Sequence, residues 1–188
     1  YPLWNAVAVQ AEAGASRPAS GGLELELCSQ SLGTAELSDS YQGLMRGVMG
    51  DYSLTATLVD LDPDSSAGLL LSADTRRADS AHFFILAERV GAGPSVLVRS
   101  GFRPAQGAAS TSVDAVSIEA TLPITLRLTR DHGVLLTSSV DANGETFQLA
   151  VPVADSALST WGQLGLVQAG SSYVAEARAR FGTPKLVF

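Results

Sequence analysis

The stretch Pro123–Val153, PITLRLTRDHGVLLTSSVDANGETFQLAVPV, contains three runs of alternating apolar and polar residues separated by two short breaks. Alternation with a period of two residues is typical of β-strands that bury one face. The breaks, Asp131-His132-Gly133 and Ala142-Asn143-Gly144, hold the residue types that form tight turns, and the Asn-Gly pair is favoured in two-residue hairpins. The stretch therefore predicts three consecutive antiparallel strands over Pro123–Arg130, Val134–Asp141 and Thr146–Val153.

The same pattern continues in both directions from this stretch, with Gly, Pro, Asp, Asn and Ser between the apolar runs. The other predicted strands are Gly22–Cys28, Asp51–Leu61, Ala67–Ser72, Ala81–Val90, Ser95–Ser100, Val113–Glu119, Gln163–Ala169 and Val174–Phe181. This many short strands, with little helical periodicity, predict an all-β, two-sheet antiparallel jelly-roll sandwich. No linker interrupts the chain, so we expect a single domain over residues 1–188, with a long surface loop at Phe102–Ser112.

For two pairs of predicted strands, the sequence predicts which side chains face each other. One pair should turn its apolar side chains inward, with Leu54, Ala56 and Leu58 against Ile124, Leu126 and Leu128. The other pair places Glu24 and Glu26 opposite Arg178 and Arg180, because jelly rolls commonly bring an early and a late strand side by side. Exposed cross-strand ion pairs contribute about 0.2–1 kcal/mol each. We therefore interpret these charges as markers of strand register.

The charge balance excludes several classes of partner. The chain has 12 Lys and Arg against 19 Asp and Glu, with a formal net charge of −7. Nucleic acids and anionic membrane surfaces bind clusters of basic residues, so neither is expected as a partner. No apolar run reaches the ~20 residues that cross a bilayer, so we expect no membrane insertion. Cys28 is the only cysteine, which excludes an internal disulfide.

Four stretches resemble a bacterial family of concanavalin-A-like domains of unknown function, related to laminin-G-type sandwiches. They are Gly50–Ala56, Ala67–Leu71 with the following strand His82–Ala87, Leu122–Arg130, and Gly162–Leu166. The order and spacing of the stretches, across residues 20–182, carry the resemblance. The chain departs from the family pattern at Thr146-Phe147, where members carry a Trp, so the resemblance implies no glycan stacking at that position.

The resemblance implies a secreted, periplasmic or cell-surface accessory module. From it we expect a non-catalytic binding or adhesion module whose ligand is a glycan or a partner protein. The position and chemistry of the predicted loops suggest ligand-binding residues at one end of the sandwich: Arg76, Arg77, His82, Arg99 and Trp161. Trp161 could stack on a sugar or cap the edge of the sandwich.

A run of alternating acids, Asp60, Asp62 and Asp64, is a possible calcium site, and calcium is the only cofactor that the sequence suggests. The run lacks the glycine at position six and the glutamate at position twelve of an EF-hand loop, where Ser65 and Leu71 stand. A solvated acidic turn is the alternative interpretation.

Two further functions stay open. A jelly-roll glycan hydrolase or lyase would need an unrecognised site, and Glu88, Arg99 and His82 are the candidates for it. The nucleophile-elbow motif Gly-x-Ser-x-Gly is missing. Glycoside hydrolysis requires two carboxylates about 5–10 Å apart. Glu24 and Glu26 are the only pair of acids at alternate positions within one predicted strand. The other open function is a structural assembly module without a small ligand.

Overall fold

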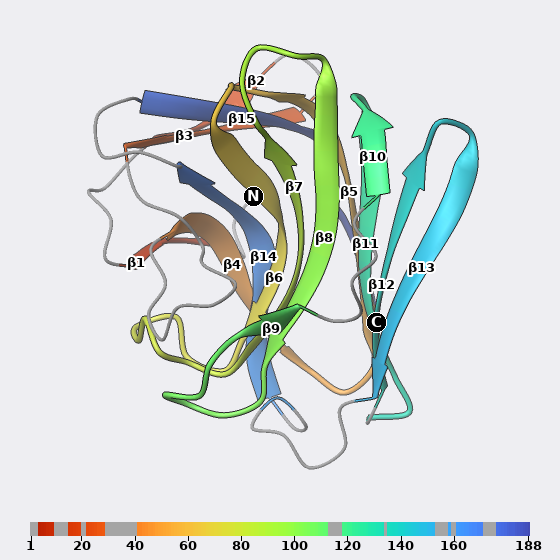
Figure 1. Cartoon of the computed structure of the whole chain (residues 1–188). Helices are drawn as coiled ribbons and strands as arrows, with labels where there is room; N and C mark the ends of the chain where they lie inside the picture. Colours follow the sequence, from red (N-terminus) through yellow and green to blue (C-terminus); the bar gives the residue numbers. More distant parts are fainter. Residues whose placement is uncertain are drawn as a thin grey trace.

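A computed structural model describes residues 4–9, 15–19, 22–28, 41–112, 118–133, 135–152, 158, 161–170 and 176–188. These residues form two antiparallel sheets of eight strands each, stacked as two layers (Figure 1). The predicted all-β, two-sheet sandwich is confirmed. No helix of the described residues has the length and apolar character needed to cross a membrane.

The first sheet, sheet A, runs from left to right in Figure 1 in the order β1-β4-β14-β6-β7-β8-β10, and the short β9 pairs with β8. Its strands are β1 (Asn5–Val9), β4 (Tyr41–Met49), β6 (Ser65–Ser72), β7 (His82–Arg89), β8 (Ser95–Arg103), β9 (Thr111–Ser112), β10 (Ile118–Thr121) and β14 (Trp161–Gly170).

The second sheet, sheet B, has the order β13-β12-β11-β5-β15-β3-β2, and β16 pairs with β5. Its strands are β2 (Ala15–Ala19), β3 (Gly22–Cys28), β5 (Tyr52–Leu61), β11 (Ile124–Asp131), β12 (Leu135–Ala142), β13 (Glu145–Pro152), β15 (Glu176–Gly182) and β16 (Lys185–Val187).

The three strands predicted from Pro123–Val153 are β11, β12 and β13, which pair in sequence order. Both turns use left-handed backbone. His132 and Gly133 have φ angles of 52° and 68°, and Asn143 and Gly144 have 54° and 84°. Asn tolerates this region and Gly adopts it without steric cost, which explains why these residues occupy the turns. The imidazole of His132 is exposed and lies 2.7 Å from the Asp131 carboxylate.

The main core lies between the sheets. Leu54, Ala56 and Leu58 point inward, as do Ile124, Leu126 and Leu128, and all are at most 2 % exposed. The two sets do not oppose each other across the core, however, because β5 and β11 are hydrogen-bonded neighbours in sheet B. They pack instead on inward residues of sheet A such as Phe83 and Ile85. A hydrogen bond of 3.0 Å between Ser138 Oγ on β12 and Ser100 Oγ on β8 joins the two layers.

The predicted pairing of an early and a late strand is also confirmed. Strand β3 lies beside β15, with Arg178 opposite Glu26 and Arg180 opposite Glu24. Both arginines are exposed. The register thus sets each arginine opposite a glutamate position, as the sequence predicts.

Five strands were not predicted from the sequence: β1, β2, β4, β9 and β16. Strand β8 also runs to Arg103, which shortens the predicted loop at Phe102–Ser112. The predicted strand Val113–Glu119 is described only from residue 118, where β10 begins. The most consequential omission is β4, since it lies between β1 and β14 near one edge of sheet A.

Candidate functional site

The outer face of sheet A, turned away from sheet B, is apolar and covered at its centre. Seven apolar side chains on it are between 0 and 2 % exposed: Tyr41, Met45, Leu70, Phe84, Leu86, Val167 and Ala169. Val7 from β1 and Ala78 from the β6–β7 loop pack against them. We call these seven residues the outer cluster. Exposed groups that could meet a ligand lie around this cluster.

Glycines on the same face leave room for the outer cluster. A Cβ at Gly101 would overlap the Phe84 ring, which lies over that glycine. A Cβ at Gly165 would come within 2.7 Å of the Met45 sulfur and would overlap the Leu44 carbonyl oxygen. The large side chains therefore lie directly over the backbone of the neighbouring strand.

Charged side chains gather in the β6–β7 loop, residues 73–81, at the lower end of sheet A (Figure 1). Arg76 forms a two-pronged ion pair with Asp74, with Nε–Oδ1 and Nη2–Oδ2 distances of 2.9 and 3.0 Å. Arg77 pairs in the same way with Asp79, at 3.1 and 3.3 Å. Two parallel charge-assisted hydrogen bonds fix the orientation of each guanidinium.

These pairs shift the titration of both carboxyl groups. Hydrogen bonds donated by the Arg76 side chain hold the pKa of Asp74 below its usual range, and the backbone amide of Arg76 adds to the effect. Hydrogen bonds from Arg77 similarly lower the pKa of Asp79. Both carboxylates therefore stay ionised at neutral pH.

We expect Asp74 and Asp79 to titrate below ordinary aspartates, as measured by carboxyl chemical shifts in an NMR pH titration. Their pKa is lower in the folded than in the unfolded state. The stability from the pairs is then present above the unfolded pKa and is lost as the pH falls through the folded value. Replacing Arg76 by Gln should return the Asp74 pKa toward normal and leave Asp79 nearly unchanged. An ordinary Asp74 pKa in the unaltered protein would contradict the pairing.

Buried polar groups at the end of β8 and the start of β7 hold the β6–β7 loop. Arg103, at the end of β8, is 0 % exposed, and its Nη1 donates to the carbonyls of Ala78 and Ser80 at 3.1 and 3.3 Å. His82 is also buried, with Nε2 2.7 Å from Ser110 Oγ and Nδ1 3.5 Å from Arg103 Nη1. These contacts fix the loop onto the sheet.

The segment that follows β8 supports the same loop. The amide of Gly107 donates to the carbonyl oxygen of Asp79 at 2.8 Å. The side chain of Gln106 lies against the Arg77–Asp79 pair. The two segments thus form one surface, on which the guanidinium groups of Arg76 and Arg77 are exposed, with side-chain exposures of 86 % and 50 %.

An exposed aromatic side chain lies at the start of β14. Trp161 is 48 % exposed and stands opposite Met49 of β4, which is 73 % exposed. The indole leans over Gly47, because its Nε1 lies 4.0 Å from the position that a Cβ on Gly47 would take. We call Trp161, Met49 and Gly47 the Trp161 platform.

The Trp161 platform and the β6–β7 loop are joined by one hydrogen bond. Thr75 Oγ1 donates to Gln163 Oε1 at 2.5 Å, and Gln163 lies two residues after Trp161 on the same face of β14. Thr75 is buried, so this contact anchors the loop beside the platform. The apolar platform and the charged loop therefore form one continuous candidate site.

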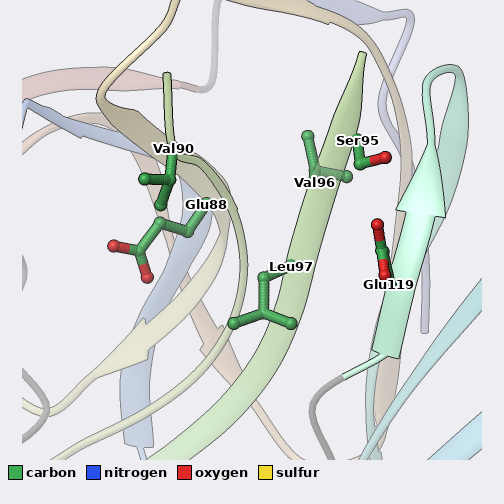
Figure 2. A pocket seen from close by; sticks show the side chains of 6 residues that line it. All are labelled: Glu88, Val90, Ser95, Val96, Leu97 and Glu119. Carbon is green, nitrogen blue, oxygen red and sulfur yellow. The ribbon is translucent and has the colours of Figure 1, made fainter. Parts of the chain in front are cut away.

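A second exposed region lies on the opposite flank of the outer cluster. Glu88 on β7, Leu97 on β8 and Glu119 on β10 are cross-strand neighbours. They line an open depression of about 210 Å³ together with Val90, Ser95 and Val96. Figure 2 shows Leu97 between the two glutamates. Arg99 Nε lies 3.3 Å from Glu88 Oε2, so one of the two carboxylates has a cationic partner.

The structure thus divides the predicted ligand-binding residues into three groups. Arg76, Arg77 and Trp161 are exposed at the same end of sheet A. His82 lies at that end too, but it is buried beneath the loop and takes no part in the exposed surface. Arg99 does not line the depression itself but pairs with Glu88, which does. The sequence also suggested Glu88, Arg99 and His82 for a hydrolase or lyase site. Glu88 and Arg99 are adjacent, but His82 contacts Arg103 and Ser110 instead.

The three aspartates suggested for calcium contact separate parts of the backbone. Asp60 Oδ1 accepts from the amide of Leu61, Asp62 Oδ2 from that of Arg178, and Asp64 Oδ1 from that of Gly91. In the part of the chain that the structure describes, no three His, Cys, Asp or Glu side chains gather closely enough to hold a metal ion. Asp62 and Asp64 connect the β5–β6 turn to β15 and to the β7–β8 turn, whereas the hydrogen bond of Asp60 is local.

With this geometry established, comparison with solved structures identifies the fold. An alginate lyase from Pseudomonas aeruginosa aligns over 98 % of this chain and 97 % of its own, with a TM-score of 0.63 and 12 % identity. The fold is concanavalin-A-like. A legume lectin-like domain from Entamoeba histolytica covers 99 % and 90 % of the two chains, with a TM-score of 0.59 and 10 % identity. A carbohydrate-binding module from Bacillus subtilis covers 99 % and 96 %, with a TM-score of 0.52 and 16 % identity. No family model matches the sequence, and no curated protein matches it in sequence.

Several residues of the candidate site were not anticipated from the sequence. Met49 and Gly47 lie on β4, a strand that was not predicted. Asp74 and Asp79 each stand two residues from their arginine, in the order Asp-Thr-Arg-Arg-Ala-Asp. Asp side chains in turns commonly bond to groups two residues away, so this spacing is a signal that could have predicted both pairs.

Proposed function

We propose that this chain is a non-catalytic carbohydrate-binding module and that the glycan stacks on the Trp161 platform. The observation that carries the proposal is the half-exposed indole of Trp161 beside Met49. Both side chains lie on the outer face of sheet A, at one end of the sheet. Large aromatic rings on a protein surface supply apolar contact area at little cost in side-chain freedom. The apolar face of a pyranose ring is a suitable partner for such a surface.

The β6–β7 loop would supply the polar contacts to the sugar. Each guanidinium uses only part of its five N–H donors in its ion pair, and each carboxylate keeps further lone pairs. These groups can donate to and accept from sugar hydroxyls without losing their own partners. Because Thr75 anchors the loop to Gln163, the polar groups are held beside the indole before any ligand arrives.

The charges of the site favour binding over hydrolysis. A glycosidase acid must carry a raised pKa so that it holds a proton at neutral pH. The pKa values of Asp74 and Asp79 are lowered instead. A carboxylate that stays ionised cannot protonate a leaving group, so these two residues suit recognition. The lectin-like domain and the carbohydrate-binding module among the similar structures are consistent with the same proposal.

Replacing Trp161 by Ala should weaken glycan binding at least about tenfold, or by about 1.4 kcal/mol. The measurement is isothermal titration calorimetry against polysaccharides selected from a panel by affinity electrophoresis. Val187→Ala is the matched control, because Val187 is also 48 % exposed but lies on β16 of sheet B. The control should bind as the unaltered protein does, and both variants should keep its melting temperature. Binding that survives the loss of the indole, or no binding to any glycan of the panel, would refute the proposal.

A further inference from the structure

We propose that the Trp161 platform and its loop select neutral glycans and exclude polyuronates, an inference that rests on the proposed function and names its substrate class. The solved structures with this fold include both lectins and alginate lyases. The fold therefore does not decide between a neutral and an anionic ligand. The choice between these ligands depends instead on how the charges on the outer face of sheet A are paired.

In the β6–β7 loop, both exposed arginines are already neutralised. Asp74 takes two hydrogen bonds from the Arg76 guanidinium and a third from the Arg76 amide, at 3.0 Å. Asp79 takes two from Arg77. A uronate carboxylate is bound best by the same two-pronged geometry. It would meet a guanidinium whose Nε–Nη2 edge is already occupied by an aspartate of the same loop, and that aspartate is always present and offsets the positive charge.

The other described arginines of β7 and β8 have partners too. Arg99 pairs with Glu88. Arg89 donates to the carbonyls of Gly93 and Leu61, at 2.9 and 2.6 Å. Arg103 is completely buried. None of these guanidinium groups is available to an anionic polymer.

The described acids on this face outnumber the described arginines that are not buried. The described acids are Asp74, Asp79, Glu88 and Glu119, against Arg76, Arg77 and Arg99. Four negative against three positive groups leave one excess negative charge, and the whole chain carries a formal net charge of −7. At low ionic strength, where charges act over about 30 Å, this field repels a polyanion. A neutral glycan is unaffected, because stacking and hydroxyl contacts need no net charge.

The test is to release the arginines from their partners. Asp74→Asn together with Asp79→Asn keeps the side-chain shape and one acceptor oxygen but removes both negative charges. We expect the unaltered protein to bind a neutral polysaccharide from the panel and not alginate. The double variant should gain alginate binding by at least about tenfold at about 0.01 M salt, and lose most of the gain at about 0.15 M, where the screening length is about 8 Å.

Two controls keep the result interpretable. Glu119→Gln removes a negative charge from the same face without freeing an arginine, and it should gain no alginate binding. If the double variant loses its thermal transition, the single change Asp79→Asn tests the same point through Arg77 alone. A folded variant that still ignores alginate, or a Glu119→Gln variant that gains as much, would overturn the inference.

The two proposals fail in different ways. An unaltered protein that binds alginate more tightly than neutral glycans would overturn the neutral selection and leave carbohydrate binding intact. A protein that binds neither kind of polysaccharide would remove the proposed function itself.

Discussion

Replacing Phe84 by Ala should lower the free energy of unfolding by about 3–5 kcal/mol, the loss expected for a fully buried phenylalanine. Phe84 lies on the outer face of sheet A. If this face were a solvated groove, the ring would be exposed and its loss would hardly change the stability. It is instead 0 % exposed, lies over Gly101, and has the Arg99 guanidinium 6.0 Å from its ring centre. Its loss would open a cavity within the outer cluster.

Urea denaturation followed by circular dichroism measures this effect, with two matched variants. Phe83→Ala removes the adjacent ring, which points into the main core and is also 0 % exposed, so it should cost about as much. Leu97→Ala removes a side chain on the same outer face that is 39 % exposed, and it should cost less than about 1 kcal/mol. If Phe84→Ala behaved like Leu97→Ala, the outer cluster would not be a second core.

Replacing Gly68 by Ala should destabilise the fold by about 3 kcal/mol or more, which is the upper range for an overpacked core. A Cβ at Gly68 would overlap the carbonyl oxygen of Ile85 and come within 2.9 Å of the Leu86 Cα. Both obstacles are backbone atoms of β7, hydrogen-bonded to β6 along its whole length. They cannot move aside as a flexible side chain can, so a single methyl group should disturb the pairing at the centre of sheet A.

Gly47→Ala provides the control for Gly68→Ala. Gly47 lies on the same face, but the nearest atom to an added Cβ would be Trp161 Nε1 at 4.0 Å, an ordinary contact distance. This variant should keep the melting temperature of the unaltered protein. Equal melting temperatures for both glycine variants would show that β6 and β7 approach less closely than described.

Strands with one buried and one exposed face could be predicted from their alternation, whereas β4, which has apolar side chains and glycines on its outer face, was missed. The alternation in β11 and β12 is clear because Thr125, Arg127 and Thr129 face away from the core. The sequence of β4, YQGLMRGVM, has no such alternation. Its outer positions hold Tyr41 and Met45, which belong to the outer cluster, and glycines that make room for neighbours. Polarity therefore carries no period-two signal there.

The candidate site was predicted only in part, because some of its contacts come from segments far away in the sequence. The sequence suggested Arg76, Arg77 and Trp161, which the structure places at one end of sheet A. Loop position and residue chemistry were sufficient for that. They could not show that His82 is buried, because Ser110 and Arg103, which contact it, come from other segments. Nor could they place Met49 beside Trp161, since that neighbour depends on the strand that was missed.

The outer cluster also bears on how this fold could change over evolutionary time. Every residue of β6 is buried, because sheet A carries apolar side chains on both faces. Strands in that position accept few substitutions, so inherited variation can accumulate there only slowly. The charged residues of the β6–β7 loop are not buried, and the loop is held by the Arg103 side chain, which donates to two of its carbonyls, and by the Thr75–Gln163 hydrogen bond. Exchanging its Asp and Arg residues could therefore change the charge that this surface presents while the scaffold stays unchanged.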